Sequence, residues 1–556
     1  MSRVLLILLV GLLLASPRPE RTKANTTAPV KATPVKVADA SCAQCHRAIY
    51  NSYLLTPMAN ASGPAAERFT TGSYNHALSH VDYTLEKVDG RPVLAWTNHN
   101  VPGGSGKRDL SYFFGSGHLG TTWLYSVNHY LFESPVAWYS AAGKLDMKPG
   151  LSNAKQMLPG LIMQSDCLRC HMSSVQPSDP GTLNRYVGLP FLHGGITCEQ
   201  CHGDTAAHLA SKGKAPVVNT AKLSADKRDS LCISCHLEAD ITVERAGRSM
   251  LNYQPGDSIA DYLAFYTYTK SDPLARGVSE VEQFNTSMCK RVSGDRMSCT
   301  SCHDPHFSPA PAQRVAFYRS KCLVCHGAPS FVKTHHPDNP DCIGCHMPHN
   351  GAENIPHVAW TDHRILPRPN RAPEAQSSST DVLKAIFSPE ANTRDLGMAY
   401  YLAYLKGNGA EGAKAWSLLS SQQQEIQSDK DKPAMDALAL LNIERGDTKT
   451  GESLFQEVLR LDPNDLTANS DLGALMAKQG ELSKSLQLLQ SAFSRNQDVA
   501  GLAMNLARVQ CARGDAAGVR STLTTALVYN PGVRELQQFL QSADTCRAPA
   551  QNGTAQ

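Results

Sequence analysis

The hydrophobic residues of this chain follow three different patterns, and the first is a short apolar run near the N-terminus. Val4–Ala15 is almost entirely apolar, follows Arg3 and precedes Ser16. A basic residue, about a dozen apolar residues and a small residue after them are typical of a secretory signal, and spanning a bilayer takes about 20 residues. We expect a signal peptide at residues 1–16, export, and no transmembrane segment after cleavage. A retained anchor is the alternative.

Strand-like apolar runs form the second pattern. Tyr83–Val88 and Val93–Trp96 flank Asp89-Gly90, a pair typical of a two-residue hairpin turn. Similar runs follow at Trp123–Val127, Tyr130–Phe132 and Val136–Tyr139. We therefore expect a small antiparallel β insert at about residues 69–150 in a mainly α protein.

The third pattern repeats every 34 residues near the C-terminus, where Leu438, Leu472 and Leu506 align. The other aligned positions are Ala439, Gly473 and Ala507, Gly446, Gly480 and Gly514, Asp447, Glu481 and Asp515, Phe455, Leu489 and Leu523, and the terminal Pro463 and Pro531. This register resembles the tetratricopeptide repeat (TPR), a helix–turn–helix unit. We expect a TPR-like α-helical solenoid over residues 381–546, with two full units, a partial unit at its end and a degenerate unit at Met398–Tyr404. Its concave face would dock a protein partner; a purely structural cap is the alternative.

Two stretches of different composition separate these parts. Residues 17–38 are rich in Pro, Thr, Lys and Ala, and residues 367–380 are rich in Pro, Arg and Ser. Such compositions favour a flexible tether and an interdomain linker, respectively. One domain is therefore expected between them, over residues 39–366.

The cysteines of this domain supply its chemistry, because 14 of the 17 cysteines fall into seven Cys-x-x-Cys-His motifs. Two thiols three residues apart can form thioethers with both vinyl groups of one haem, and the next residue can then bind the iron as the proximal ligand. The sequence thus predicts a heptahaem cytochrome c domain with seven covalent haem c groups. The cysteines are Cys42, Cys45, Cys167, Cys170, Cys198, Cys201, Cys232, Cys235, Cys299, Cys302, Cys322, Cys325, Cys342 and Cys345, and the proximal histidines are His46, His171, His202, His236, His303, His326 and His346.

Other uses of paired cysteines explain these motifs less well. Zinc sites combine such pairs into tetrahedral clusters and do not require a histidine after every second cysteine, and dithiol redox motifs need no histidine either. A disulfide scaffold is not the leading explanation either, because it would not place 14 cysteines in one repeated motif that ends in histidine. Outside the motifs, the segment Thr286-Ser-Met-Cys289-Lys290 leaves two alternatives. One is a single-thioether haem with Lys290 as ligand, and the other is a buried free thiol.

Each iron can also take a distal ligand on its opposite face. His306 and His349 lie three residues after a proximal histidine, which is too close to reach the other face of the same haem, so we expect them to bind neighbouring haems. Met58, after the first motif, is a candidate ligand that would raise the haem potential, or else a core residue. Further candidates are His118, His193, His208, His357 and His363, whereas His335 and His336 fall in an apparent loop.

Three segments carry a resemblance to a known superfamily: Met297–His306, Cys342–His349 and Trp360–Ile365. They resemble the multihaem cytochromes that include tetrahaem electron carriers, pentahaem nitrite reductase and octahaem hydroxylamine oxidoreductase, over about residues 40–365. The resemblance implies bis-histidine haems packed in parallel and perpendicular pairs. It also implies that His306, His349 and His363 act as distal ligands, and it extends to relatives with a C-terminal TPR region.

These features predict electron transfer in the periplasm or at the cell surface. Six motifs share the 180 residues from Cys167 to His346, so the haems must lie close together. The formal net charge of the chain is +3, which by itself excludes little. Each ferric haem with two propionates would add about −1, so the haem-loaded protein should be acidic. We therefore expect no nucleic-acid partner. Redox partner proteins and a protein docked on the TPR region are expected instead. The alternatives are a reductase of a nitrogen or sulfur oxyanion with one open haem, and a subunit of an extracellular cytochrome filament.

Overall fold

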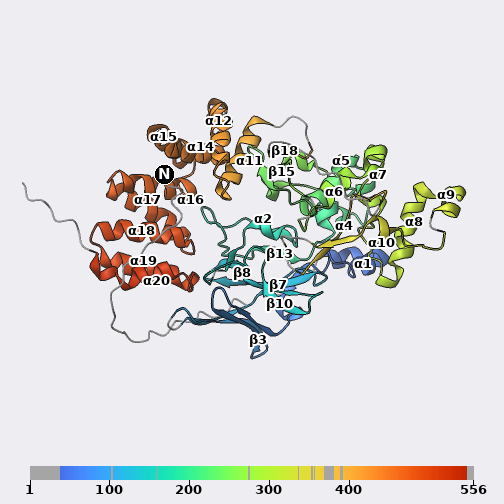
Figure 1. Ribbon diagram of the computed structural model, residues 1–556, viewed down its shortest axis with the longest axis horizontal. Helices are drawn as coiled ribbons and strands as arrows, with labels where there is room; N and C mark the ends of the chain where they lie inside the picture. The colour runs from blue at the N-terminus through green and yellow to red at the C-terminus, as the bar shows by residue number, and fades with distance from the viewer. Residues whose placement is uncertain are drawn as a thin grey trace, which may run out of the picture.

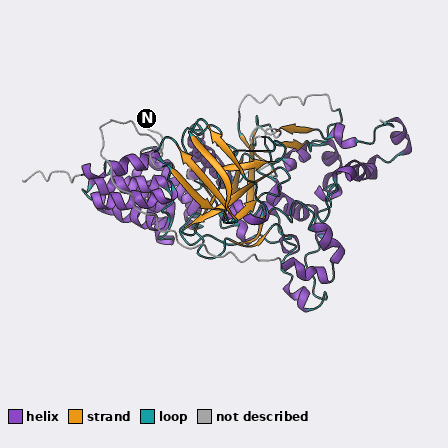
Figure 2. Cartoon of the chain, turned by 90° about the horizontal axis from the view of Figure 1, so that it is seen from below, coloured by secondary structure: helices purple, strands orange, loops and turns teal. Residues whose placement is uncertain are grey.

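The computed structural model describes residues 38–546 apart from positions 102–103, 158–159, 273, 275, 336, 352–354, 356, 369–380 and 388–391. The expected signal peptide, almost all of the tether and most of the linker therefore lie outside the described residues. Three regions follow one another across the molecule, with the C-terminal helices at one end, the main β-sheets in the middle and short helices at the other end (Figures 1 and 2). In the described part of the chain, no helix combines the length and the apolar content needed to cross a membrane.

The expected β insert consists of two antiparallel sheets. The four-stranded sheet contains β2 (Gly72–His76), β3 (Val81–Val88), β4 (Arg91–Asn98) and β5 (Ser105–Asp109). The seven-stranded sheet contains β1 (Ser62–Pro64), β6 (Tyr112–Phe114), β7 (Gly120–Val127), β8 (Tyr130–Glu133), β9 (Val136–Tyr139), β10 (Lys144–Met147) and β11 (Leu161–Ile162). The predicted hairpin joins β3 to β4 through Asp89 and Gly90, whose φ angles are 51° and 78°. Two positive φ values in sequence are what a type I′ turn requires.

The β region has a hydrophobic core of its own, which includes fully buried Trp123, Tyr83 and Phe132. Tyr529, from the C-terminal helices, packs into the same core. The insert is therefore larger than expected and is continuous in packing with the helical region.

The helices and strands that surround the motifs are short. The helices are α1 (Arg47–Tyr53), α2 (Ser165–Leu168), α3 (Glu199–His202), α4 (Ala206–Ala210), α5 (Ala225–His236), α6 (Glu280–Thr286), α7 (Met288–Ser293), α8 (Arg314–His326), α9 (Pro329–Thr334) and α10 (Cys342–His346). The strands are β12 (Met172–Val175), β13 (Phe191–Gly194), β14 (Ile241–Glu244), β15 (Leu263–Tyr268), β16 (His349–Gly351), β17 (Ala359–Thr361) and β18 (Leu383–Ala385). β18 pairs with β15, so residues expected to begin the solenoid instead complete a sheet of the motif-bearing region.

The C-terminal region is the expected α-helical solenoid, and its helices are α11 (Thr393–Leu405), α12 (Glu411–Ser420), α13 (Gln423–Ser428), α14 (Lys432–Glu444), α15 (Thr448–Leu461), α16 (Leu466–Lys478), α17 (Leu482–Arg495), α18 (Ala500–Ala512), α19 (Ala516–Tyr529) and α20 (Arg534–Gln541). The aligned Gly446, Gly480 and Gly514 all have positive φ and end the first helix of each pair. The last unit, expected to be partial, is a complete pair, because α18 and α19 have 13 and 14 residues. The mainly α fold with antiparallel sheets is thus confirmed.

The solenoid is attached to the rest of the chain at two places. Near its start, buried Arg394 forms ion pairs with Asp395 and Asp431 and donates to the Glu244 carbonyl of β14, while Arg245 pairs with Asp395 at 2.7 Å. Near its end, loops between helices contact the β region: the Tyr130 hydroxyl donates to the Arg495 carbonyl at 2.6 Å, and Asn496 donates to the Gly181 carbonyl at 2.8 Å. One edge of the solenoid is therefore already covered within the chain.

Candidate haem-binding sites

Each motif forms a single tight turn that brings its cysteines and its histidine together. The backbone N–H of His46 donates to the Cys42 carbonyl at 2.8 Å, and the equivalent bonds at the third and fifth motifs measure 2.9 and 3.0 Å. The fourth, sixth and seventh motifs form the last turns of α5, α8 and α10. One helical turn places side chains three and four residues apart on a common face, which suits two thioethers and one axial bond to the same macrocycle.

Among the described residues, four motif histidines face a histidine from outside the motifs, with nearly parallel rings. The four pairs, with their ring-centroid distances and interplanar angles, are His46–His208 at 6.5 Å and 19°, His202–His306 at 6.1 Å and 7°, His303–His363 at 6.2 Å and 28°, and His346–His335 at 5.9 Å and 26°. These separations are too long for direct ring stacking. Two imidazoles that bind one metal ion from opposite sides, each with a metal–nitrogen distance of about 2 Å, have centroids about 6 Å apart. The pairs thus leave the space that one iron requires.

Backbone carbonyls orient one ring in each pair through its Nδ1 atom. His208 Nδ1 lies 2.7 Å from the Ala215 oxygen and His202 Nδ1 lies 2.9 Å from the Val218 oxygen. A carbonyl can only accept, so Nδ1 carries the proton and Nε2 keeps its lone pair for a metal. The corresponding acceptors are the Thr361 oxygen for His363, at 2.8 Å, and the Leu366 oxygen for His346, at 2.5 Å.

Burial favours the neutral form of two motif histidines. Burial, and after it the charges of His363 and His236, lowers the pKa of His303 to about 4. Burial likewise lowers the pKa of His171 to about 4. A metal ligand must be the neutral imidazole, so both rings are in the required state near neutral pH.

Of the other candidate ligands, some lie opposite a motif histidine and others do not. His208, rather than Met58, faces the first motif, and His335 faces the last motif although its position in a loop gave no such signal. His357 Nε2 donates a hydrogen bond to the Asp146 carboxylate at 2.7 Å, so this nitrogen is already engaged. Among the described residues, His118, His193 and His349 make no ring contact with a motif histidine.

The candidate distal histidines face motifs other than the ones that they follow in the sequence. His306 follows the fifth motif but faces the third, His208 follows the third but faces the first, and His335 follows the sixth but faces the seventh. The sequence predicted this kind of exchange for His306. The His46–His208, His202–His306 and His303–His363 pairs therefore join chain segments that are remote from one another in sequence, whereas His335 and His346 are 11 residues apart.

The thiols of different motifs also lie in contact. A hydrogen bond with Cys235 raises the pKa of Cys170, and a hydrogen bond with Cys232 raises the pKa of Cys299. The Cys42 thiol is likewise hydrogen-bonded to Cys198, and the Cys322 thiol to Cys342. Because a thioether sulfur lies at the edge of its porphyrin, touching sulfurs imply adjacent porphyrin edges.

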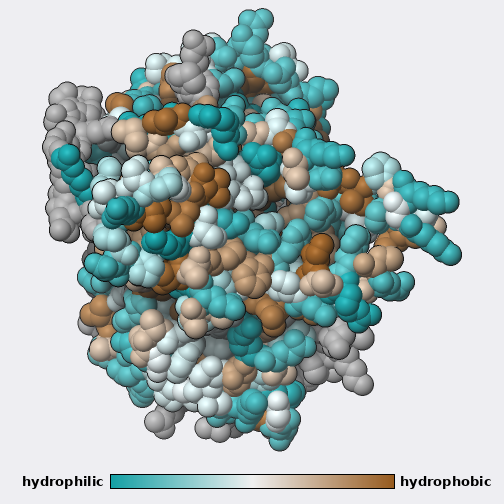
Figure 3. Space-filling view, turned by 90° about the vertical axis from the view of Figure 1, so that its right-hand side faces the viewer, coloured by the Kyte–Doolittle hydropathy of each residue, from teal (hydrophilic) through white to brown (hydrophobic). Residues whose placement is uncertain are grey.

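The packing around the last three motifs fits a large apolar group. Helices α7, α8, α9 and α10 contain no buried residue among those described. Apolar side chains nearby are strongly exposed, with 82% of Val324, 81% of Leu55 and 70% of Val292 accessible. Figure 3 views this end of the molecule, where hydrophobic side chains lie between hydrophilic ones. Exposed apolar surface of this kind marks a binding site, and covalently held porphyrins would cover it.

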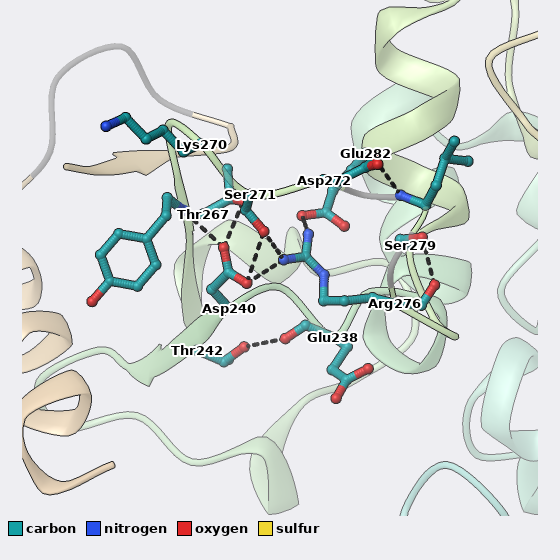
Figure 4. Close-up of polar contacts among 12 residues, drawn as sticks. Glu238, Asp240, Thr242, Thr267, Lys270, Ser271, Asp272, Arg276, Ser279 and Glu282 are labelled. Carbon is teal, nitrogen blue, oxygen red and sulfur yellow. Dashed lines mark hydrogen bonds and ion pairs between the residues drawn. The ribbon is translucent and has the colours of Figure 1, made fainter. Parts of the chain in front are cut away.

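A buried charge cluster positions one of the distal histidines. Arg276 lies beside Asp240 (Figure 4) and pairs also with Glu282 of α6, which fixes that helix to the loop before β14. The next residue of α6, Gln283, accepts a hydrogen bond from the His363 backbone N–H at 2.8 Å. The cluster thus holds His363 opposite His303 through one intermediate side chain. It is a non-local arrangement with no sequence signature.

Two findings concern the cysteines outside the motifs. The Lys290 ammonium donates to the Met297 carbonyl at 2.8 Å and lies over the Phe284 ring, and Cys289 is partly buried. Cys511 and Cys546 form a disulfide that closes the end of the solenoid. The bond was not predicted from the sequence, although two cysteines outside the haem motifs could have indicated a disulfide if the chain is exported.

Three family models match parts of the chain. They are cytochrome c554 and c-prime over residues 139–203, the doubled CXXCH motif over residues 292–330, and the tetratricopeptide repeat over residues 442–502. Two of them match parts of the motif-bearing region, and the third matches part of the solenoid.

Among curated proteins, the multiheme cytochrome MtrA of Shewanella baltica (strain OS185) is 27% identical over 177 residues, which are 29% of this chain and 51% of that protein. The chain thus spans about half the length of this relative. Among solved structures, the outer cell wall cytochrome OcwA aligns with a TM-score of 0.38 and 15% identity over 83% of this chain and 99% of that one. MamA AMB-1 aligns with a TM-score of 0.24 and 17% identity over 27% of this chain and 78% of that one.

The motif turns, the histidine pairs and the matches to three family models agree with one another. The motifs are those of covalent haem c. The chain is a multihaem c-type cytochrome with C-terminal tetratricopeptide repeats.

Proposed function

We propose that this protein transfers electrons through seven covalently bound haems, one at each motif, in the periplasm or outside the cell. The observation that carries the proposal is the set of four facing histidine pairs. An iron held by two histidines has no free coordination position for a substrate, and such a haem exchanges electrons rather than atoms. The four pairs are proposed as the axial ligands of the first, third, fifth and seventh haems.

The contacts between thiols support conduction. Electron tunnelling weakens steeply as the distance between cofactor edges grows, so haems must be closely spaced to conduct. The hydrogen-bonded thiol pairs Cys42–Cys198, Cys170–Cys235, Cys232–Cys299 and Cys322–Cys342 each join two different motifs and would bring the edges of the two haems close together. The protein around them sets the redox potentials.

The solenoid is proposed to dock a redox partner protein with the surface that the rest of the chain leaves uncovered. Helical repeats of this type bind other proteins through an extended face. The Cys511–Cys546 disulfide supports export, because disulfides persist in oxidising compartments. No nucleic-acid partner is proposed.

The proposal is tested on protein produced in a host that matures c-type cytochromes. Mass spectrometry of the mature chain should show the added mass of seven porphyrins, and reduction followed by oxidation in a voltammetric cell should be reversible for all of them. Added mass for fewer porphyrins would reject the count. A large high-spin signal that binds nitrite or cyanide would favour the oxyanion reductase instead.

A further inference from the structure

We propose that Arg276 is a positioning residue for the fifth haem, and that it makes the distal ligation of this haem depend on the solenoid. The proposal rests on the proposed function, because it requires an iron between His303 and His363. Hydrogen bonds behind a metal ligand fix its orientation and tune the metal. The first helix of the solenoid would then support a haem ligand in addition to docking a partner.

Helix α11, the first of the solenoid, lies along strand β14 and is fixed to both ends of it. Near the start of α11, Arg394 donates to the Glu244 carbonyl at 2.7 Å. At the C-terminal cap of α11, Lys406 donates to the Asp240 carbonyl at 3.0 Å. Between these bonds, buried apolar residues of the strand and of the helix belong to one hydrophobic core. The solenoid therefore sets the position of β14.

Asp240, the residue just before β14, connects this strand to Arg276 (Figure 4). Its carboxylate pairs with the Arg276 guanidinium and accepts from the Thr267 hydroxyl and the Tyr268 backbone N–H, each at 2.8 Å. The Ser271 hydroxyl donates to the same carboxylate at 3.1 Å and accepts from Arg276 at 2.9 Å. A displacement of β14 would therefore also displace the partner of Arg276.

Two routes lead from Arg276 to Gln283 of α6. In the first, the guanidinium pairs with Glu282, the preceding residue of this helix. In the second, the Arg276 carbonyl accepts from the Ser279 hydroxyl at 3.1 Å, and this hydroxyl accepts from Gln283 Nε2 at 2.7 Å. The other end of the Gln283 amide, Oε1, accepts from the His363 backbone N–H at 2.8 Å. Arg276 thus orients the amide that holds His363.

Burial makes this arrangement depend on the charge of Arg276. Arg276, Glu282 and Gln283 are only 9%, 6% and 3% exposed. Without the guanidinium, the carboxylates of Asp240 and Glu282 would be left uncompensated, and an uncompensated buried charge is strongly unfavourable. Glu282 would move towards water and carry Gln283 with it, because the two are consecutive residues of α6.

The fifth site differs in this respect from the other three facing pairs. In those pairs, among the described residues, backbone carbonyls at most 20 positions away in the sequence orient one ring; they belong to Ala215, Val218 and Leu366. Gln283, in contrast, lies 80 positions from His363. A disturbance at the joint between α11 and β14 should therefore reach the fifth haem and leave the others unchanged.

The test uses full-length holoprotein from a host that matures c-type cytochromes. His363→Ala identifies the fifth haem, because about one haem in seven should become high-spin in the EPR spectrum. Arg276→Met should keep seven porphyrins by mass but move or abolish the low-spin EPR signal of this one haem. The affinity of the same haem for cyanide should rise roughly 10–100-fold, because the histidine that cyanide displaces is held less firmly.

Two further arginine variants separate positioning from general destabilisation. Arg394→Met breaks the chain of contacts at its solenoid end and should change the same EPR signal. Arg108→Met is the matched control: it removes a different contact between the solenoid and the rest of the chain, the bond to the Val528 carbonyl at 2.7 Å, and should change no haem signal. A change in Arg276→Met without one in Arg394→Met would reject the dependence on the solenoid.

An unchanged fifth-haem signal in Arg276→Met would overturn the proposal, and so would a simultaneous change in several haems. In case Arg276→Met does not fold, Glu282→Gln keeps the shape and an acceptor oxygen but removes one charge. It should alter the fifth haem alone, and an unaltered spectrum would again overturn the proposal. The two proposals fail separately: fewer than seven porphyrins, or no high-spin haem in His363→Ala, counts against the proposed function, whereas the arginine variants test only the role of Arg276.

Discussion

His202 and His306 face each other with ring centroids 6.1 Å apart and ring planes only 7° apart, although 103 residues lie between them in the sequence. The proposal that they bind one iron predicts the effect of His306→Ala. The haem should stay attached through Cys198 and Cys201 but lose its distal ligand, so that about one haem in seven becomes high-spin. EPR and the charge-transfer absorption of the ferric protein measure this fraction. His99→Ala, at an exposed histidine paired with Asp82 in the β region, is the control and should show no new high-spin haem.

His335 faces His346, the histidine of the last motif, with their ring centroids 5.9 Å apart. We expect His335→Ala to create one high-spin haem. Adding Cys342→Ala/Cys345→Ala to His335→Ala should remove the new high-spin signal, because the seventh haem is then no longer attached. This result would assign the signal to the seventh site. An unchanged low-spin spectrum in His335→Ala would contradict this assignment.

The Cys511–Cys546 disulfide closes a loop with a sequence separation of 35 residues. Loop-closure entropy predicts that Cys511→Ser/Cys546→Ser lowers the free energy of unfolding of the solenoid by about 3–4 kcal/mol. Denaturant unfolding followed by far-UV circular dichroism measures the change. Cys289→Ser, which removes a thiol outside the solenoid, should leave this transition in place. Equal free energies of unfolding for the double variant and the wild type would show that the disulfide does not stabilise the last helices of the solenoid.

Asp436 in α14 is a buried carboxyl group, and burial, followed by the charges of Asp465 and Asp471, raises its pKa to about 9. The unfolded chain releases this proton near pH 4, whereas the folded chain keeps it. Stability contributed by the protonated group is therefore complete below about pH 4 and is lost progressively as the pH rises towards about 9.

Asp436→Asn removes this titration. We expect the variant to be more stable than the wild type at pH 8 by on the order of 1–3 kcal/mol, with the difference disappearing at pH 4. Unfolding curves at the two pH values test the expectation. Asp447→Asn is a control, because Asp447 is an exposed helix cap and its replacement preserves a good capping residue. A larger gain at pH 4 than at pH 8 would contradict the assignment.

The sequence predicted features that depend on neighbouring residues and missed those that depend on remote ones. The seven motif turns, the Asp89-Gly90 hairpin and the 34-residue register are local, so their residues could be named directly. The partners His208 for His46 and Asp146 for His357 come from distant segments. Spacing alone excluded His306 as a ligand of its own haem, but it could not say which neighbouring site it faces. The Arg276 cluster that positions His363 has no local pattern at all.

The absence of buried residues in the described parts of α7–α10 has a consequence for biogenesis. A segment without its own hydrophobic interior cannot hold its shape before haem is attached, so the proposed metal–imidazole bonds would be what fixes its helices relative to one another. Attachment and folding would then be one process. A failed attachment at a single site would release two stretches of polypeptide at once and expose them to proteolysis.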